Sequence, residues 1–152
     1  MIKKLSKLPV ILVASFMLVM FIIDSLEIFP SFEFRHQSIV SFTIFGLGFL
    51  VISIGGYTFR KVNTTVNPMT PDLTSYLVRN GIYGVSRNPM YIDFFFWLVA
   101  CGLFVGNVAN IFLFQLYVIL VNKLYIIPEE EALRNLFGKE FEKYEDEVNR
   151  WL

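Results

Sequence analysis

Two polar segments interrupt an otherwise apolar sequence, and their residue types are those that bind small molecules. The first, called here the Arg-Asn-Pro segment, runs from Gly81 to Tyr91 and precedes a long apolar run. The second, the triple-Glu segment, begins at Pro128 after the next apolar run and carries three consecutive glutamates. If the two runs form a hairpin across a bilayer, both segments lie at the same membrane face. An arginine, an asparagine, two tyrosines and several carboxylates then meet, which predicts a binding site.

Each residue of these segments also has an ordinary structural explanation. Pro89 is favourable in the first turn of a helix, and tyrosines such as Tyr83 and Tyr91 concentrate at membrane interfaces. Glutamates that follow Pro128 in a first helical turn interact favourably with the helix dipole, and for Glu131 we prefer that explanation. What favours a site is the combination of Gly-x-Tyr and Arg-Asn-Pro-x-Tyr within eleven residues.

The composition predicts a membrane protein. The 152 residues are 55% hydrophobic and 17% Phe, Trp or Tyr, more than a small soluble core can bury. Uncharged runs at 8–23, 37–59 and 94–122 compare with the roughly 20 residues that cross a bilayer core. The last run is too long for one span, and Gly106-Asn107 is a turn signal within it. The sequence therefore predicts an all-α integral membrane bundle, a single domain over 1–152, with about four transmembrane helices, at 8–28, 37–59, 90–105 and 108–127.

The C-terminal part of the chain carries a different pattern. Apolar residues recur there at spacings of three and four, at Leu133, Phe137, Phe141, Tyr144, Val148 and Trp151. This spacing predicts an amphipathic helix over 128–151. Such a helix can lie at the membrane interface or fold under the bundle as a lid.

The N-terminal run has two interpretations. Lysines at positions 3, 4 and 7 before about 16 apolar residues also describe a signal peptide. The small-residue cleavage pattern of such a peptide is missing, because the run ends in Asp24-Ser25-Leu26-Glu27. We therefore predict a retained span.

The distribution of basic residues predicts the orientation, because Lys and Arg favour the cytoplasmic side. With four spans, the N-terminus, the loop 60–87 and the C-terminal tail share one face, which leaves only Arg35 on the other. We expect both termini and the site to be cytoplasmic, where a soluble nucleotide-like cofactor is available. The net charge of zero gives no indication of nucleic acid as a partner, and the oligomeric state stays open.

Three further residues need an explanation. Cys101 is a single cysteine in the third predicted span, which excludes an intrachain disulfide and a multi-cysteine metal site. His36 has no partner pattern, so we expect no metal. Asp93 lies one turn into the third span, where snorkelling towards the headgroups is the preferred explanation and a functional role is the alternative.

The combined pattern resembles the isoprenylcysteine carboxyl methyltransferase and phospholipid methyltransferase superfamily. It consists of Gly81-Ile82-Tyr83, Ser86-Arg87-Asn88-Pro89-Met90-Tyr91, Glu129-Glu130 and the apolar face that ends in Arg150-Trp151. The resemblance covers 75–151. It implies a small integral membrane methyltransferase that uses S-adenosylmethionine, held in a pocket capped by the C-terminal segment. It also implies a lipophilic small-molecule or prenylated substrate that arrives from the membrane lipid.

The resemblance implies roles for individual residues. Glu129 would hold the ammonium of the cofactor, and Arg87 and Asn88 its carboxylate, through charge-assisted bonds. Tyrosines would pack against the adenosine and the sulfonium. The catalytic assignment falls on Arg87, Asn88 and Glu130. The cofactor-binding assignment falls on Ser75, Tyr76, Leu77, Val78, Tyr83, Asn88, Pro89, Met90, Tyr91 and Glu129.

Two positions depart from the family pattern. The family usually has histidine where this chain has Asn88, and the isoprenylcysteine enzymes have an arginine, attributed to the substrate carboxylate, where this chain has Tyr125. Lys123 lies nearby, so Lys123 and Tyr125 are the substrate-binding candidates. The acceptor is then either an isoprenylcysteine-like carboxylate or a phospholipid headgroup amine. Two other functions stay open: a non-catalytic membrane scaffold of the same fold, and an NADPH-dependent membrane reductase.

Overall fold

The computed structural model describes residues 8–61 and 76–152, and the regular structure in these ranges is helical. The predicted all-α class is therefore confirmed. In chain order the elements are α2 (Leu8–Ser25), α3 (Gln37–Lys61), the 3-10 turn η2 (Gly81–Gly84), α4 (Pro89–Val105), α5 (Asn110–Val121), the π-helical turn η3 (Asn122–Ile126), α6 (Ile127–Phe137) and α7 (Lys139–Glu147).

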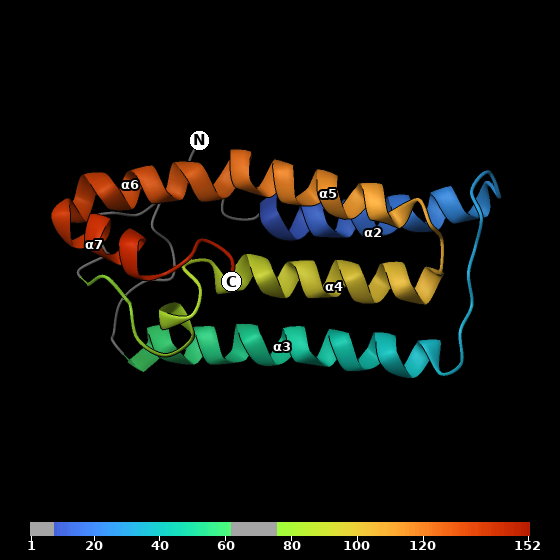
Figure 1. Cartoon of the computed structure of the whole chain (residues 1–152), viewed down its shortest axis with the longest axis horizontal. Coiled ribbons are helices and arrows are strands. Elements are labelled where there is room, and N and C mark those ends of the chain that lie inside the picture. Colours follow the sequence, from blue (N-terminus) through green and yellow to red (C-terminus); the bar gives the residue numbers. More distant parts are fainter. Residues whose placement is uncertain (1–7, 62–75) are drawn as a thin grey trace.

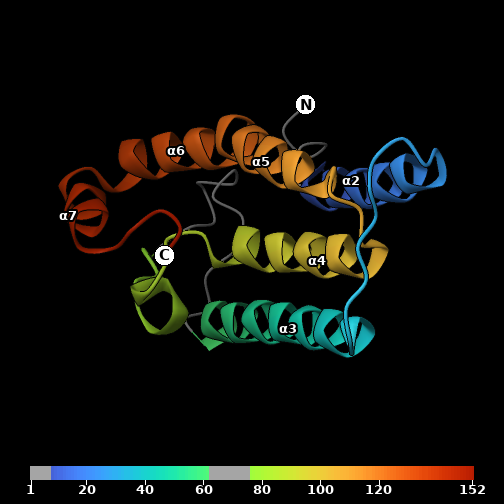
Figure 2. The ribbon, with the colours of Figure 1, turned by 45° about the vertical axis from the view of Figure 1, so that its right-hand side comes forward.

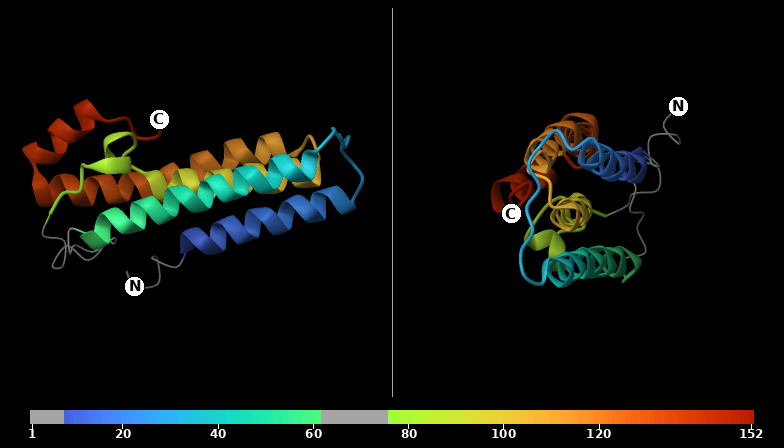
Figure 3. Two further views of the ribbon diagram at one scale, coloured as in Figure 1. Left: turned by 90° about the horizontal axis from the view of Figure 1, so that it is seen from below. Right: turned by 90° about the vertical axis from the view of Figure 1, so that its right-hand side faces the viewer.

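The long helices run side by side along the long axis of the molecule (Figure 1). The turned views show α4 in the middle, with α3 on one side and α2 and α5 on the other (Figures 2 and 3). The main core lies between α2, α4 and α5 and contains Met20, Leu98, Tyr117 and Val121. Helix α4 contacts all three neighbouring helices. The Arg-Asn-Pro segment leads into the first turn of α4 and therefore lies at the centre of one end of the bundle.

Two helical stretches, Gln37–Thr58 and Asn110–Phe137, are long and apolar enough to cross a membrane. Their apolar stretches support the predicted membrane character, and α2 and α4 are apolar but shorter. The count of four spans stays a prediction. In the second stretch the apolar part ends at Ile127, since Pro128 is followed by three glutamates.

Helix α3 packs on α4 through small residues. Of its residues with described burial, only Ser41, Gly48 and Gly55 are buried, at a spacing of seven. Small side chains on one face allow two membrane helices to approach closely. Large apolar side chains elsewhere on α3, such as Phe42 and Phe49, are exposed. A helix with its apolar residues outward fits a lipid environment better than water.

The C-terminal part differs from the single helix predicted over 128–151. The helix α6 continues α5 and η3 without a break, and the chain then turns at Gly138, whose φ is 52°. Glycine tolerates positive φ because it lacks a Cβ, so the chain reverses into α7 there. The predicted apolar face is present, because Phe141 and Tyr144 of α7 pack with Leu77 in a second small core. After α7 the chain is non-helical.

The α4–α5 turn gives a stability prediction. Gly106 ends α4 with a φ of 72°, and its carbonyl accepts a 2.6 Å hydrogen bond from the Phe32 N–H. A Cβ at Gly106 would overlap the Phe32 carbonyl oxygen and lie 2.9 Å from Nε2 of Gln37. Gly106→Ala should therefore cost more than the roughly 1–2 kcal/mol of the left-handed backbone alone. The midpoint of thermal unfolding in detergent, followed by circular dichroism, measures this loss.

The matched control is Gly46→Ala in α3, because a Cβ at Gly46 would meet no atom within 4 Å. Alanine is favoured over glycine inside a helix, so this variant should unfold at the wild-type temperature or above. A Gly106→Ala variant as stable as Gly46→Ala would contradict the prediction.

Candidate functional site

The two polar segments meet at the end of the bundle where α4 begins and α6 and α7 lie (Figure 1). Arg87 of the first segment donates hydrogen bonds from Nε and one terminal nitrogen to Oε1 of Glu130, at 3.2 and 3.0 Å. The hairpin of α4 and α5 therefore brings together segments that are 43 residues apart.

Glu130 is a buried carboxylate shared by two arginines. Its side chain is 4% exposed, and Arg150 also donates to it, at 3.1 Å from Nε to each oxygen. The hydrogen bonds to Glu130 raise the pKa of the Arg150 guanidinium above its usual value. Two guanidinium groups therefore compensate the charge of this buried carboxylate. Arg150 was not a site candidate in the sequence.

The Arg-Asn-Pro segment also binds residues 148–152, called here the C-terminal strap. The second terminal nitrogen of Arg87 donates to the carbonyls of Glu145 and Val148, at 3.0 and 3.1 Å. Ser86 and Asn88 both donate to the Arg150 carbonyl, at 3.2 and 3.1 Å. Arg87 and Asn88 are thus engaged with the strap, so a direct contact with a ligand carboxylate requires them to exchange these partners.

Glu129 has a different environment from its neighbour. Oε1 of Glu129 accepts a 2.8 Å hydrogen bond from the Tyr91 hydroxyl, and Tyr91 stacks on Tyr125 with ring centroids 6.1 Å apart. None of the ion pairs within the described part of the chain involves Glu129. Burial, partly offset by the Tyr91 hydrogen bond, raises the pKa of the Glu129 carboxyl to about 7, and the charge of Glu130 contributes.

Two more tyrosines close the site from the side of η2 and α7. The Tyr144 hydroxyl donates to the Tyr83 carbonyl at 2.6 Å, which fixes the 3-10 turn on α7. Burial raises the pKa of Tyr144 to about 12. Burial, with smaller contributions from Tyr144 and Glu129, also raises the pKa of Tyr83. Both phenols are therefore neutral at physiological pH and act as hydrogen-bonding or packing groups.

The π-helical turn η3 determines which side chains of α5 and α6 face the site. Asn122 donates to the Val118 carbonyl at 2.9 Å and accepts a 3.3 Å bond from the Trp151 indole. Tyr125 is buried against Tyr91, whereas Lys123 is exposed. Single π-helical turns are frequent at functional sites. Of the two substrate-binding candidates, the structure brings only Tyr125 into the cluster.

The remaining predicted residues divide into groups. Leu77 and Val78 are buried, Tyr76 is exposed, and Ser75 lies outside the described residues. Pro89 is buried at the start of α4, and Met90 is partly buried. Sequence reasoning gave no individual role to Ser86, Arg150 or Trp151, although the family pattern includes all three. The place of Arg150 in that pattern was the available signal for a second cation beside Glu130.

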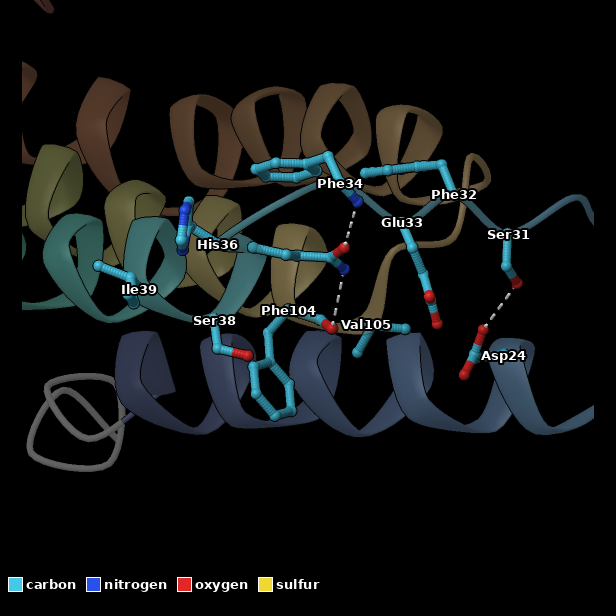
Figure 4. A pocket seen from close by; sticks show the side chains of 11 residues that line it. Asp24, Ser31, Phe32, Glu33, Phe34, His36, Ser38, Ile39, Phe104 and Val105 are labelled. Carbon is cyan, nitrogen blue, oxygen red and sulfur yellow. Dashed lines mark hydrogen bonds between the residues drawn. The ribbon is translucent and has the colours of Figure 1, made fainter.

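A cavity of about 520 Å³ lies at the opposite end of the bundle, beside the α2–α3 connection and the end of α4 (Figure 4). Gln37 forms part of its wall, and its Nε2 donates a hydrogen bond to the Leu103 carbonyl at 2.7 Å. None of the predicted site residues lines this cavity. His36 does, but no group of three His, Cys, Asp or Glu side chains in the described ranges is arranged to hold a metal.

Comparison with known proteins finds relatives for most of the chain. The model of the phospholipid methyltransferase family matches residues 36–140. A protein-S-isoprenylcysteine O-methyltransferase of Schizosaccharomyces pombe is 35% identical over 72 residues, which are 47% of this chain and 30% of that protein. A protein of the same name from Saccharomyces cerevisiae is 26% identical over 130 residues, 80% of this chain and 54% of that protein.

An uncharacterized protein of Haemophilus influenzae is 32% identical over 63 residues, which are all of that protein and 41% of this chain. The two yeast enzymes are thus matched over 30% and 54% of their own length.

Proposed function

Because this chain belongs to the phospholipid methyltransferase family, whose model matches residues 36–140, we propose that it is a membrane methyltransferase that uses S-adenosylmethionine and methylates a lipophilic acceptor. The proposal places the cofactor beside Glu129, Tyr91 and Tyr125, at the end of the bundle that carries both polar segments. The names of the yeast relatives, both isoprenylcysteine O-methyltransferases, support the reaction type.

The observation that carries the cofactor assignment is the state of Glu129. This carboxylate is partly buried, is held by the Tyr91 hydroxyl, and has no cationic partner in any ion pair of the described residues. An ammonium group is the ligand chemistry that such a carboxylate lacks. The faces of Tyr91 and Tyr125 suit an electron-poor sulfonium. When bound, S-adenosylmethionine supplies the activated methyl group.

The chain's own contribution is orientation and exclusion of water. Arg87, Glu130 and Arg150 hold the strap at the start of α4, and we infer that the strap shields the site from water. Holding two reactants in a dry, fixed geometry supplies much of the rate of a displacement that needs no strong acid or base. The arginine network therefore acts as a positioning device.

We place both termini and the site at the cytoplasmic face, with four spans and an acceptor that enters from the bilayer. The exposed apolar side chains of α2 and α3 support contact with lipid. The Lys and Arg residues of the N-terminus, the loop 60–87 and the C-terminal tail support this orientation, because basic residues favour the cytoplasmic side.

Equilibrium dialysis of the detergent-solubilised protein against labelled S-adenosylmethionine tests the cofactor assignment. We expect saturable binding that unlabelled S-adenosylmethionine displaces and NADPH does not. Displacement by NADPH alone would favour the reductase. Saturable binding without methyl transfer to any lipid extract would favour a non-catalytic scaffold. No saturable binding by folded protein would contradict the proposal.

The exposure of Lys123 gives a prediction about the acceptor. Because its side chain is exposed, Lys123→Met should leave cofactor affinity and methyl transfer within about twofold of wild type, as for most surface substitutions. Transfer to prenylated cysteine and to phosphatidylethanolamine is measured for both proteins. Loss of transfer to prenylated cysteine alone would show that Lys123 binds an acceptor carboxylate.

A further inference from the structure

Trp151 connects the C-terminal strap to a different element from the other strap residues. The rest of the strap is held by the Arg-Asn-Pro segment and by Glu130. The indole N–H of Trp151 instead donates to Oδ1 of Asn122 at 3.3 Å. The Trp151 ring is partly buried and packs against the main core, of which Tyr91 and Tyr125 are members. Trp151 therefore joins the end of the chain to the π-helical turn η3.

Asn122 is the residue at which η3 begins. Its carbonyl accepts a hydrogen bond from the N–H of Ile127, five residues later, whereas the partner in an α-helix is four residues later. The side chain of Asn122 bonds at the same point, because its Nδ2 donates to the Val118 carbonyl at 2.9 Å while its Oδ1 accepts from Trp151. A contact from the strap thus reaches the π-helical turn through Asn122.

The turn η3 sets the direction of the site residues that lie in it or follow it. One extra residue in a helical turn rotates everything after it by about 100° around the helix axis. Tyr125 lies within η3, and Glu129 follows in α6. In the structure Tyr125 stacks on Tyr91, and Glu129 accepts the hydrogen bond of the Tyr91 hydroxyl. A regular α-helical turn in place of η3 would rotate Glu129 away from Tyr91.

We propose that Trp151 is a positioning residue, whose hydrogen bond to Asn122 holds η3 in its π-helical form. This turn in its place keeps Glu129 and Tyr125 against Tyr91, beside which the cofactor binds. The inference rests on the proposed function. It goes beyond the shielding of the site, because a strap that only excludes water needs no bond to η3. Coupling between two sites is reciprocal, so a cofactor held at Glu129 also stabilises the bond between Trp151 and Asn122.

Two conservative substitutions remove this bond, one from each end. Trp151→Phe keeps an aromatic ring but has no N–H to donate. Asn122→Ser keeps a hydroxyl that can donate to the carbonyl four residues earlier, as Ser15 in α2 and Thr43 in α3 do at 2.8 Å. The serine side chain is shorter than that of asparagine, so it does not reach Trp151. Leu152→Ala is the matched control, because Leu152 belongs to the same strap and is 76% exposed.

Hydrogen exchange of the backbone amides of η3, measured by mass spectrometry on the full chain in a non-ionic detergent without cofactor, tests the link from Trp151 to the turn. We expect faster exchange in Trp151→Phe and in Asn122→Ser, because local opening becomes easier. The double variant should exchange no faster than either single variant, since both substitutions remove one bond. Leu152→Ala should exchange like wild type. Unchanged exchange in either single variant, or increases that add in the double variant, would overturn the inference.

The dissociation constant of S-adenosylmethionine then separates positioning from a purely structural role. Each single variant should weaken binding about two- to tenfold, as for one neutral hydrogen bond, and the double variant should bind no more weakly than either. Faster exchange of η3 with wild-type affinity would show that the bond only stabilises the helix, and would overturn the positioning role. No binding of S-adenosylmethionine by wild type would contradict the proposed function, and the exchange result alone would then decide whether Trp151 holds η3. If one variant does not fold, the other, compared with Leu152→Ala, decides.

Discussion

Replacing Arg87 by methionine is expected to lower the free energy of unfolding by about 3–5 kcal/mol, the range for breaking a buried ion pair by removing one partner. The Arg87 side chain is 10% exposed and binds the Glu130 carboxylate as well as the carbonyls of Glu145 and Val148. Methionine keeps the unbranched apolar part of the side chain but leaves these acceptors unpaired. Chemical denaturation in detergent, followed by circular dichroism, measures the loss.

Arg134→Met is the matched control. Arg134 also pairs with Glu145, at 2.7 Å, but its side chain is 44% exposed. An exposed ion pair contributes little because water and salt screen it, so this variant should unfold at the same denaturant concentration as wild type. Equal losses in the two variants would show that Glu145, and not the buried network around Glu130, determines the effect. Such a result would also remove the argument that Arg87 holds the strap.

The meeting of the two polar segments was predictable, because it depends only on two apolar runs that fold back on each other. The different roles of Glu129 and Glu130 were not. Adjacent residues on a helix are about 100° apart around its axis, so one carboxylate faces Tyr91 and the other faces Arg87. The π-helical turn η3 before these glutamates and Arg150 after them decide which glutamate faces Tyr91 and which faces Arg87. Neither the π-helical turn nor the position of Arg150 can be predicted from the local sequence.

The burial of Asp93, which is 0% exposed, depends in the same way on a distant residue. A helix position near the membrane surface predicts snorkelling, but Gly48 on another helix provides the space that keeps the carboxyl inside. The break at Gly138 was hidden for a different reason. The apolar spacing continues across it from Phe137 to Phe141, so the periodicity that predicts a helix cannot distinguish one helix from two that pack on the same core.

Glu129→Gln is expected to weaken S-adenosylmethionine binding about ten- to a hundredfold, or about 1.5–3 kcal/mol, the range for a hydrogen bond to a charged group. Glutamine keeps the size of the side chain and an oxygen for the Tyr91 hydroxyl, but it has no charge for the cofactor ammonium. Glu131→Gln is the control, since Glu131 is exposed in the same turn of α6. Equal weakening in both variants, measured as dissociation constants, would show that the negative charge acts through the helix dipole and not through a contact.

The raised pKa of Glu129 makes the same contact testable by pH. In the protein without cofactor this carboxyl has a pKa of about 7, so it takes up a proton as the pH falls through neutrality. The cofactor ammonium is mostly charged at about pH 7 and stays so down to about pH 5.5. Affinity should therefore decrease as the pH is lowered through this range in wild type, because the carboxylate partner is lost. In Glu129→Gln, with no group to titrate at this position, the affinity should be low and nearly independent of pH. A pH dependence that survives in Glu129→Gln would assign the titration to another group and contradict the role of Glu129 as the ammonium ligand.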